Sequence, residues 1–237
     1  MNALQKNYNE RLFSNGIRSR YHFARYFWLR NTLLRLGCSC RRVLELGCFD
    51  AKTLSFLPKE PEYYLGYDAD WEGGLQMGRA KWADRRNVDL RFCNSPEHLV
   101  DAEPFDVSVC METLEHLPVQ DIEAYLEFLR RMTRDYCFIT IPVELGLILP
   151  FKYVYKSIIG SVTTPYRFKE LAAATMGRMK SVPRIETTHK GFDYRECLRI
   201  VGLFFDVVEI EGIPFGWLPA YLNPTIGIVA KPKTVIK

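Results

Sequence analysis

Short aliphatic runs that alternate with helix-forming segments are the feature of this sequence that most restricts its fold. The runs that resemble strands cover residues 42–47, 63–68, 88–93, 105–110 and 136–141, and the helical spacings cover residues 19–36, 50–57, 71–82, 119–133 and 194–203. Strands that alternate with helices require right-handed crossovers, which build a largely parallel sheet covered on both faces. The sequence therefore predicts a doubly wound α/β fold.

Two more strands are predicted near the C-terminus, at residues 206–210 and 225–230. A loop rich in glycine, proline and aromatic residues separates them, so we expect an antiparallel hairpin that closes one edge of the sheet. The hairpin brings the predicted sheet to seven strands, most of them parallel. A chain of 237 residues is the right size for this sheet with additions, and we expect residues 1–237 to form a single domain.

Two segments stand outside the alternation. Residues 1–42 contain nine Lys or Arg side chains against Glu10 alone, and we interpret them as a basic, helical N-terminal segment. Such a segment is usually a solvated helix face, and an anionic partner is the alternative. Residues 143–188 mix apolar, aromatic and basic side chains, and we interpret them as an inserted helical cap.

The distribution of apolar and charged residues predicts a cytoplasmic protein without a transmembrane segment. The most apolar stretch, residues 143–160, is interrupted by three charged side chains and falls short of the ~20 apolar residues that a spanning helix needs. Charged residues also stand where a secretory signal would carry its apolar stretch. The seven cysteines are an odd number without a regular framework, which indicates reduced thiols.

The segments that follow the first four predicted strands contain the candidate binding residues. Ligands of open parallel sheets lie at the carboxyl ends of the strands, where loops present backbone N–H groups. An aspartate at the end of the second strand is the usual partner of a ribose, because a carboxylate accepts two hydrogen bonds side by side. The candidates are Glu45, Gly47, Cys48, Phe49, Asp50, Asp68, Ala69, Asn94, Ser95, Met111 and Glu112, and the family resemblance described next adds Cys110.

These segments resemble the class I S-adenosylmethionine-dependent methyltransferases. The resemblance lies in the runs VLELGCFDAKTL, YYLGYDAD, RFCNSPEHL, FDVSVCMETLEHL and FITIP, between about residues 40 and 141, and more loosely in residues 189–230. It implies S-adenosylmethionine as the cofactor, with its methionine part along Glu45 and residues 47–50. It also implies that Asp68 holds the ribose, that Ala69, Asn94 and Ser95 lie near the adenine, and that residues 110–112 line the other side.

The sequence departs from the family pattern in two loops. The family's first loop reads acid-x-Gly-x-Gly-x-Gly, whereas Phe49 and Ala51 replace the second and third glycines here. We therefore expect a backbone that is less free to adopt positive φ. The third strand ends in Asn94 and Ser95 where the family usually has an aspartate, so this end of the site carries no charge.

Two histidines are the candidate catalytic residues. Methyl transfer to a hydroxyl requires a nucleophile in line with the methyl group and a base for its proton. His116 follows the fourth strand and His189 follows the insert, and an imidazole suits proton transfer near neutral pH. A structural hydrogen-bonding role is the alternative for each.

The same region also permits a metal interpretation. A set of four residues resembles the metal site of small-RNA 3′-end 2′-O-methyltransferases, namely Glu112, Glu115, His116 and His189. Carboxylates and imidazoles can bind Mg²⁺ or Mn²⁺. Glu-His after the fourth strand also occurs in metal-free methyltransferases similar to those of ubiquinone biosynthesis. We expect no metal, and we keep a metal-dependent RNA 2′-O-methyltransferase as the alternative.

The inserted cap is predicted to set the choice of acceptor. Its interleaved aromatic and basic side chains suit a pocket for a sugar or aromatic ring, or contact with a membrane surface. The run GCFDAKTL is also similar to methyltransferases associated with surface-polysaccharide and glycolipid synthesis. We expect a small-molecule, glycan or lipid-linked acceptor, methylated on a hydroxyl. A nucleic acid is the less favoured partner, and a cofactor-binding module without enzymatic activity is a further alternative.

Overall fold

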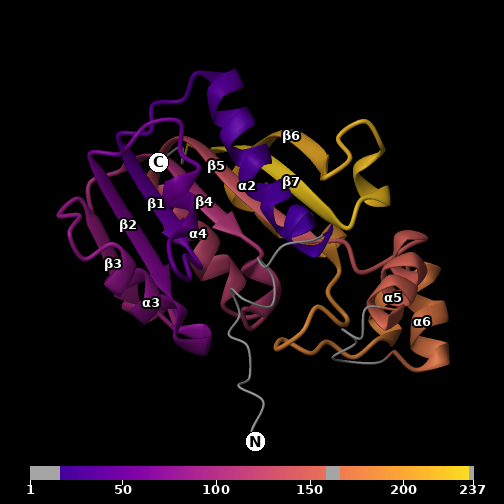
Figure 1. Cartoon of the computed structure of the whole chain (residues 1–237). Coiled ribbons are helices and arrows are strands. Elements are labelled where there is room, and N and C mark those ends of the chain that lie inside the picture. The colour runs from indigo at the N-terminus through magenta and orange to yellow at the C-terminus, as the bar shows by residue number, and fades with distance from the viewer. Residues whose placement is uncertain (1–16, 159–165, 235–237) are drawn as a thin grey trace, which may run out of the picture.

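A seven-stranded sheet forms the centre of the computed structural model, which describes residues 17–158 and 166–234 (Figure 1). Its strands are β1 (Arg42–Leu46), β2 (Tyr63–Asp68), β3 (Val88–Phe92), β4 (Phe105–Met111), β5 (Thr133–Pro142), β6 (Phe205–Ile213) and β7 (Thr225–Pro232). The order across the sheet is β3-β2-β1-β4-β5-β7-β6. The first five strands are parallel, and β7 runs antiparallel to both β5 and β6. The predicted doubly wound α/β fold with a closing hairpin is therefore confirmed.

Helices cover both faces of this sheet (Figure 1). They are α2 (Ile17–Leu36), α3 (Gly74–Lys81), α4 (Ile122–Met132) and α7 (Tyr194–Phe204), and the remaining described α-helices are α5 (Ile148–Ile158) and α6 (Phe168–Thr175). One core cluster joins α4 and α7 to the sheet, and a second joins α2 and α3 to its opposite face. Residues 1–16 of the predicted basic segment lie outside the described residues, and the helix of its remaining part is present as α2.

Helix α2 lies close to the hairpin strands because one glycine permits the approach. A Cβ atom at Gly227 would lie 2.4 Å from the ring of Trp28. The indole Nε1 of Trp28 donates a hydrogen bond of 3.0 Å to Glu211 of β6, which satisfies its one polar group. Any side chain larger than hydrogen at position 227 would push α2 away from the sheet.

Two predicted helices differ from the structure. The segment 50–57 forms only a 3₁₀ turn, Lys52–Ser55, because the buried hydroxyl of Thr53 donates to Glu45 and holds the turn against β1. The segment 71–82 is divided into a 3₁₀ turn, Trp71–Gly73, and α3, because Glu72 and Gly73 have positive φ angles that a continuous helix excludes.

Helices α5 and α6 belong to the insert and have a small core of their own. This core consists of Leu145, Leu149, Ala174, Met179 and Val182. The pair stands at the lower right of Figure 1, beside the sheet. Across the described residues, no helix has both the length and the apolar character required to span a bilayer.

Candidate active site

Asp68 ends β2 and organises two loops at the carboxyl edge of the sheet. Its Oδ2 accepts a hydrogen bond of 2.9 Å from the backbone N–H of Phe49, and its Oδ1 accepts one of 2.7 Å from Asp70. The side chain is 9% exposed, and burial raises its pKa although these backbone N–H groups oppose the shift. Each oxygen keeps a second lone pair, so Asp68 can still accept hydrogen bonds from a ligand.

The loop after β1 adopts left-handed backbone conformations at residues that are not glycine. The φ angles are +74° at Gly47, +49° at Phe49 and +53° at Ala51. Phe49 and Ala51 thus adopt positive φ although they are less free to do so than glycine, and the loop carries strain of about 1–3 kcal/mol at each position. The bond from Phe49 to Asp68 and a bond of 2.7 Å from the Ala51 N–H to the Cys48 carbonyl hold it in place.

Several predicted cofactor residues have side chains that point into the protein. Cys48, Cys110 and Met111 belong to the two core clusters, so only their backbone groups are available to a ligand. Ala69 and Asn94 are exposed, and Asp50 is buried with its carboxylate 2.9 Å from the amino group of Lys52. Ser95 is half-buried and follows β3.

Glu45 is buried within the sheet, away from the loop surface. Its Oε1 accepts a hydrogen bond of 2.6 Å from Thr53, and its Oε2 accepts one from the hydroxyl of Tyr64. Burial raises the pKa of Glu45 to about 8, although these two hydrogen bonds oppose the shift. Through Thr53, Glu45 holds the turn that follows the loop after β1.

We expect this buried carboxyl to make the fold less stable as the pH rises. A pKa of about 8 in the folded chain exceeds the ~4.3 of an unfolded glutamate, so the stabilisation is complete below the lower value and is lost as the pH rises through the higher one. The free energy of unfolding, measured with urea at a series of pH values, should fall by a few kcal/mol across this interval. Glu45→Gln should remove most of this slope, whereas the exposed control Glu123→Gln should retain it. Equal slopes in the two variants would contradict the assignment.

The chain after β4 turns sharply and presents the candidate catalytic residues. Glu112 has a φ of +51°, and its backbone N–H donates to the Thr140 carbonyl at 2.9 Å. A 3₁₀ turn, Leu114–His116, follows directly. It places Glu115 in the interior and His116 at the edge of the site.

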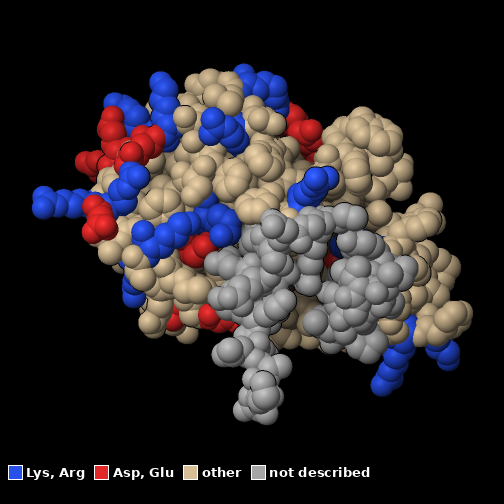
Figure 2. Space-filling model, viewed as in Figure 1, with Lys and Arg blue, Asp and Glu red and all other residues tan. Residues whose placement is uncertain are grey.

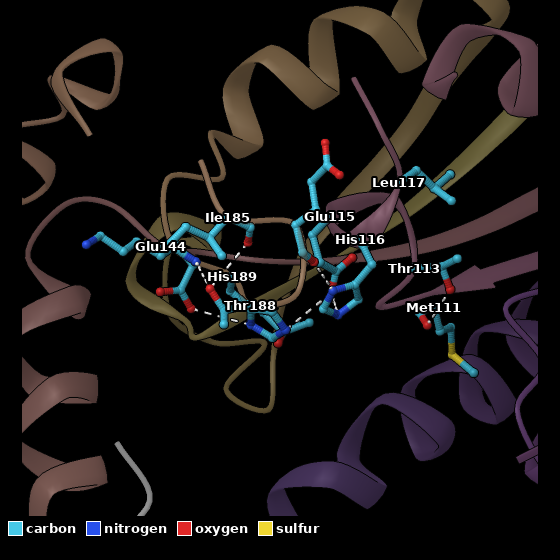
Figure 3. Close-up of polar contacts among 12 residues, drawn as sticks. Met111, Thr113, Glu115, His116, Leu117, Glu144, Ile185, Thr188 and His189 are labelled. Atoms are coloured by element: carbon cyan, nitrogen blue, oxygen red, sulfur yellow. Dashed lines mark hydrogen bonds and ion pairs between the residues drawn. The ribbon is translucent and has the colours of Figure 1, made fainter. Parts of the chain in front are cut away.

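Glu115, His116 and His189 converge at this point (Figure 3). The Oε1 atom of Glu115 lies 3.9 Å from Nε2 of His116 and 3.7 Å from Nε2 of His189. The two imidazole rings lie 5.2 Å apart between centroids. The structure thus brings together both predicted catalytic histidines, from segments that are distant in the sequence.

The tautomer of His116 follows from its hydrogen bond. Its Nδ1 lies 2.7 Å from the carbonyl oxygen of Glu186, and because a carbonyl only accepts, Nδ1 carries the proton. The lone pair of Nε2 is then directed into the cluster. Glu186 belongs to the insert, so the end of the insert helps to build this site.

Known proteins resemble this chain in structure alone. No protein-family model matches it, and no curated protein matches it in sequence. A S-adenosylmethionine-dependent methyltransferase from Clostridium acetobutylicum ATCC 824 has a TM-score of 0.63 over 96% of both chains at 10% identity. The magnesium protoporphyrin IX methyltransferase ChlM from Synechocystis PCC 6803, a structure with bound SAH, has a TM-score of 0.60 over 94% of this chain and 92% of its own at 12% identity.

A third solved structure is the methyltransferase domain of bacterial CtHen1-CN. Its TM-score is 0.58 over 89% of this chain and 99% of that domain, at 16% identity. The matches extend over nearly the whole length of each partner and share one sheet architecture. The chain has the class I methyltransferase fold. At these identities the likeness concerns the fold, and the chemistry has to be argued from the residues.

The surroundings of Glu115 and His116 shift the pKa values of both side chains. Burial raises the pKa of Glu115 well above its ordinary value, and the neighbouring Glu112 raises it further. Neither oxygen of Glu115 has a hydrogen-bond partner within residues 17–158 and 166–234. Burial lowers the pKa of His116, although its bond to Glu186 opposes the shift, so this imidazole is neutral near pH 7.

Two charged residues of the site were not predicted from the sequence. Glu144 is buried and lies 3.7 Å from Nδ1 of His189, and Lys152 of α5 lies 2.5 Å from the Glu144 carboxylate. Burial alone would lower the pKa of Lys152, but Glu144 and Tyr21 outweigh it and the pKa is raised. The available signal was the pair of charges, Glu144 and Lys152, within the apolar stretch 143–160.

The donor set of the cluster also fits a divalent cation. Ligand atoms of Glu115, His116 and His189 all lie within 4.8 Å of one another. A buried carboxylate without a hydrogen-bond partner and two imidazoles are a donor set that transition metals accept. Glu112, the fourth residue of the metal interpretation, does not belong to this group within the part of the chain that the structure describes.

Proposed function

We propose that this protein is an S-adenosylmethionine-dependent methyltransferase that methylates a hydroxyl group of a small-molecule, glycan or lipid-linked acceptor. The observation that carries the proposal is the cluster of Glu115, His116 and His189 at the carboxyl end of β4. In a parallel α/β sheet this edge is where ligands bind, and Asp68 lies on the same edge at the end of β2. A candidate base and a candidate ribose partner therefore share one site.

S-adenosylmethionine would be held by the loops after the first four strands. Asp68 would accept hydrogen bonds from the ribose, and Ala69, Asn94 and Ser95 would lie near the adenine. Residues 47–50 and 110–112 would offer mainly backbone groups to the methionine part. The related ChlM structure contains SAH, which supports this choice of cofactor.

The cofactor supplies a methyl group that its sulfonium has already activated, so the chain has to orient the acceptor and accept one proton. Nε2 of His116 or of His189 would accept the proton of the acceptor hydroxyl as the oxygen is methylated. The carboxyl group of Glu115, 3.7 Å from His189 and 3.9 Å from His116, would orient the two imidazoles. The carbonyl of Glu186 fixes the tautomer that this step requires.

A metal-dependent RNA 2′-O-methyltransferase is the second candidate function. Its support is the Glu115 carboxyl group, which lies between two imidazoles and has no hydrogen-bond partner among the described residues, a donor set that fits a transition metal such as Mn²⁺. Such an ion would act on the acceptor oxygen as a Lewis acid. The CtHen1 domain shares the fold with this chain, but at 16% identity it does not decide between the two functions.

Removal of divalent metal separates the two functions. If the histidines act as bases, methyl transfer should be unchanged within a few fold after treatment with EDTA, and Mn²⁺ or Mg²⁺ should add nothing. The measurement is transfer of a tritium-labelled methyl group from S-adenosylmethionine into lipid, glycan and RNA fractions of a cell extract. Loss of activity in EDTA that Mn²⁺ or Mg²⁺ restores would instead support the RNA function.

A further inference from the structure

Large apolar side chains are exposed on three elements at one edge of the molecule. Phe151 of α5 is 74% exposed, Phe168 of α6 is 88% exposed, and Trp217 in the loop between β6 and β7 is 81% exposed. Figure 2 shows this side, at the right of the view, as a surface with few charged side chains. We call it the apolar edge and define it by Leu147, Phe151, Phe168, Met176, Trp217 and Tyr221.

The three elements of the apolar edge are joined by hydrogen bonds. The amino group of Lys152 in α5 donates to the Pro224 carbonyl at 3.4 Å, which connects the helix to the loop between β6 and β7. The backbone N–H of Gly146 donates to the Ala174 carbonyl at 3.0 Å, which connects the start of α5 to α6. These hydrogen bonds therefore hold the three elements against one another.

Each helix of the insert buries one side and exposes apolar groups on another. In α5, Leu149 enters the small core and Lys152 reaches Glu144, while Phe151 is exposed. In α6, Ala174 is buried, while Phe168 is exposed at the start of the helix. Surface helices of globular proteins normally present polar side chains on the exposed side. A group of exposed aromatic residues marks an interaction surface.

The charges around the apolar edge indicate a partner with negative charge. Among the residues of the insert whose exposure is described, four basic residues are exposed, namely Arg167, Lys169, Arg178 and Lys180. Within the described residues of the insert, Glu186 is the exposed acidic residue, and residues 214–224 contain no charge at all. Lys and Arg side chains project from the lower end of this side in Figure 2, beneath α6.

A bilayer with anionic headgroups is complementary to this combination. Basic residues are attracted to its surface potential, and exposed Phe and Leu side chains enter the boundary between headgroups and acyl chains. Trp and Tyr are the residues that favour this boundary, because one part of each ring system is apolar and the other is polar. Trp217 and Tyr221 stand in the charge-free loop of the apolar edge.

We infer that the apolar edge docks on the surface of an anionic membrane and that the acceptor is lipid-linked. The second part rests on the proposed function, whereas the docking does not. The helix α5 relates the two, because Phe151 is exposed on the apolar edge and the adjacent Lys152 binds Glu144 of the candidate active site. A protein docked in this way would hold its active site one helix away from the lipid surface.

Co-sedimentation of the full chain with vesicles tests the docking without cofactor or acceptor. We expect binding to vesicles of phosphatidylcholine with roughly one-third phosphatidylglycerol, and weak binding to phosphatidylcholine alone. The double variant Phe168→Ser, Trp217→Ser should bind about tenfold more weakly or worse, and Lys169→Glu and Lys180→Glu should each weaken binding about fivefold. The controls Leu203→Ser and Lys59→Glu alter exposed residues elsewhere and should bind as the unaltered chain does.

Three results would overturn the inference. The first is absence of binding to the anionic vesicles at low salt. The second is an equal loss in the control variants. The third is an oligomer of the unaltered chain in sedimentation velocity that becomes a monomer only in the Phe168→Ser, Trp217→Ser variant, while this variant still binds vesicles as the unaltered chain does. Binding of S-adenosylhomocysteine, measured separately on the same samples, shows whether the proposed function fails independently of the docking.

Discussion

Of His116→Ala and His189→Ala, the variant that removes the base is expected to lower methyl transfer by about 10²- to 10⁴-fold, the usual contribution of a general base. Both Nε2 atoms lie within 4 Å of the buried Glu115 carboxylate, at 3.9 and 3.7 Å, and either imidazole would lose its function in proton transfer on truncation. The rate should be measured with labelled S-adenosylmethionine and the lipid and glycan fractions of a cell extract as acceptors.

Cofactor affinity distinguishes a catalytic loss from a folding defect. Both histidine variants should bind S-adenosylhomocysteine within a few fold of the unaltered chain, because Asp68 and the loop after β1 are unchanged. Glu123→Gln, on the exposed side of α4, should retain full activity. If both histidine variants keep activity within a few fold of the unaltered chain, neither residue is the base.

Asp68→Ala is expected to weaken S-adenosylhomocysteine binding by one to two orders of magnitude. The carboxylate would lose charge-assisted hydrogen bonds to the ribose, each worth about 1.5–3 kcal/mol. It would also release the Phe49 N–H, which now donates to Oδ2 at 2.9 Å and holds the left-handed loop. Isothermal titration calorimetry gives the affinity, and thermal unfolding shows whether the variant is folded.

Two further variants make the Asp68 result interpretable. Asp68→Asn keeps the size of the side chain and removes its charge, so we expect an intermediate affinity. Asp89→Ala changes an aspartate of β3 that pairs with Arg91 at the edge of the sheet, and it should bind the cofactor normally. Unchanged affinity in a folded Asp68→Ala protein would show that the ribose lies elsewhere.

The sheet was predictable because each of its strands has a local signature. All seven residues of β4 are buried and five of them are apolar, which is typical of a central parallel strand. The hairpin strands β6 and β7 were recognisable from the turn-forming residues between them. The segment 50–57 was predicted as a helix because its spacing is helical, but the buried bond from Thr53 to Glu45 limits it to a 3₁₀ turn.

The candidate site was only partly predictable, because its geometry depends on tertiary contacts. The sequence identified Asp68, His116 and His189 from their positions after strands and after the insert. It could not show that Glu144 and Lys152 form a buried ion pair beside His189, since α5 brings them together only after the insert has folded. Nor could it show that Phe49 and Ala51 adopt the left-handed backbone conformation that glycine favours, because hydrogen bonds to Asp68 and Cys48 hold that conformation.

The central claim is that the carboxyl edge of β1 and β2 binds S-adenosylmethionine, and calorimetric titration of the unaltered chain tests it most directly. The account predicts that S-adenosylmethionine and S-adenosylhomocysteine each bind at a single site. A dissociation constant of about 1–100 μM would be typical of an enzyme for such a ligand. Absence of binding by both ligands, in a sample whose thermal unfolding shows a cooperative transition, would contradict the assignment of this chain as a methyltransferase.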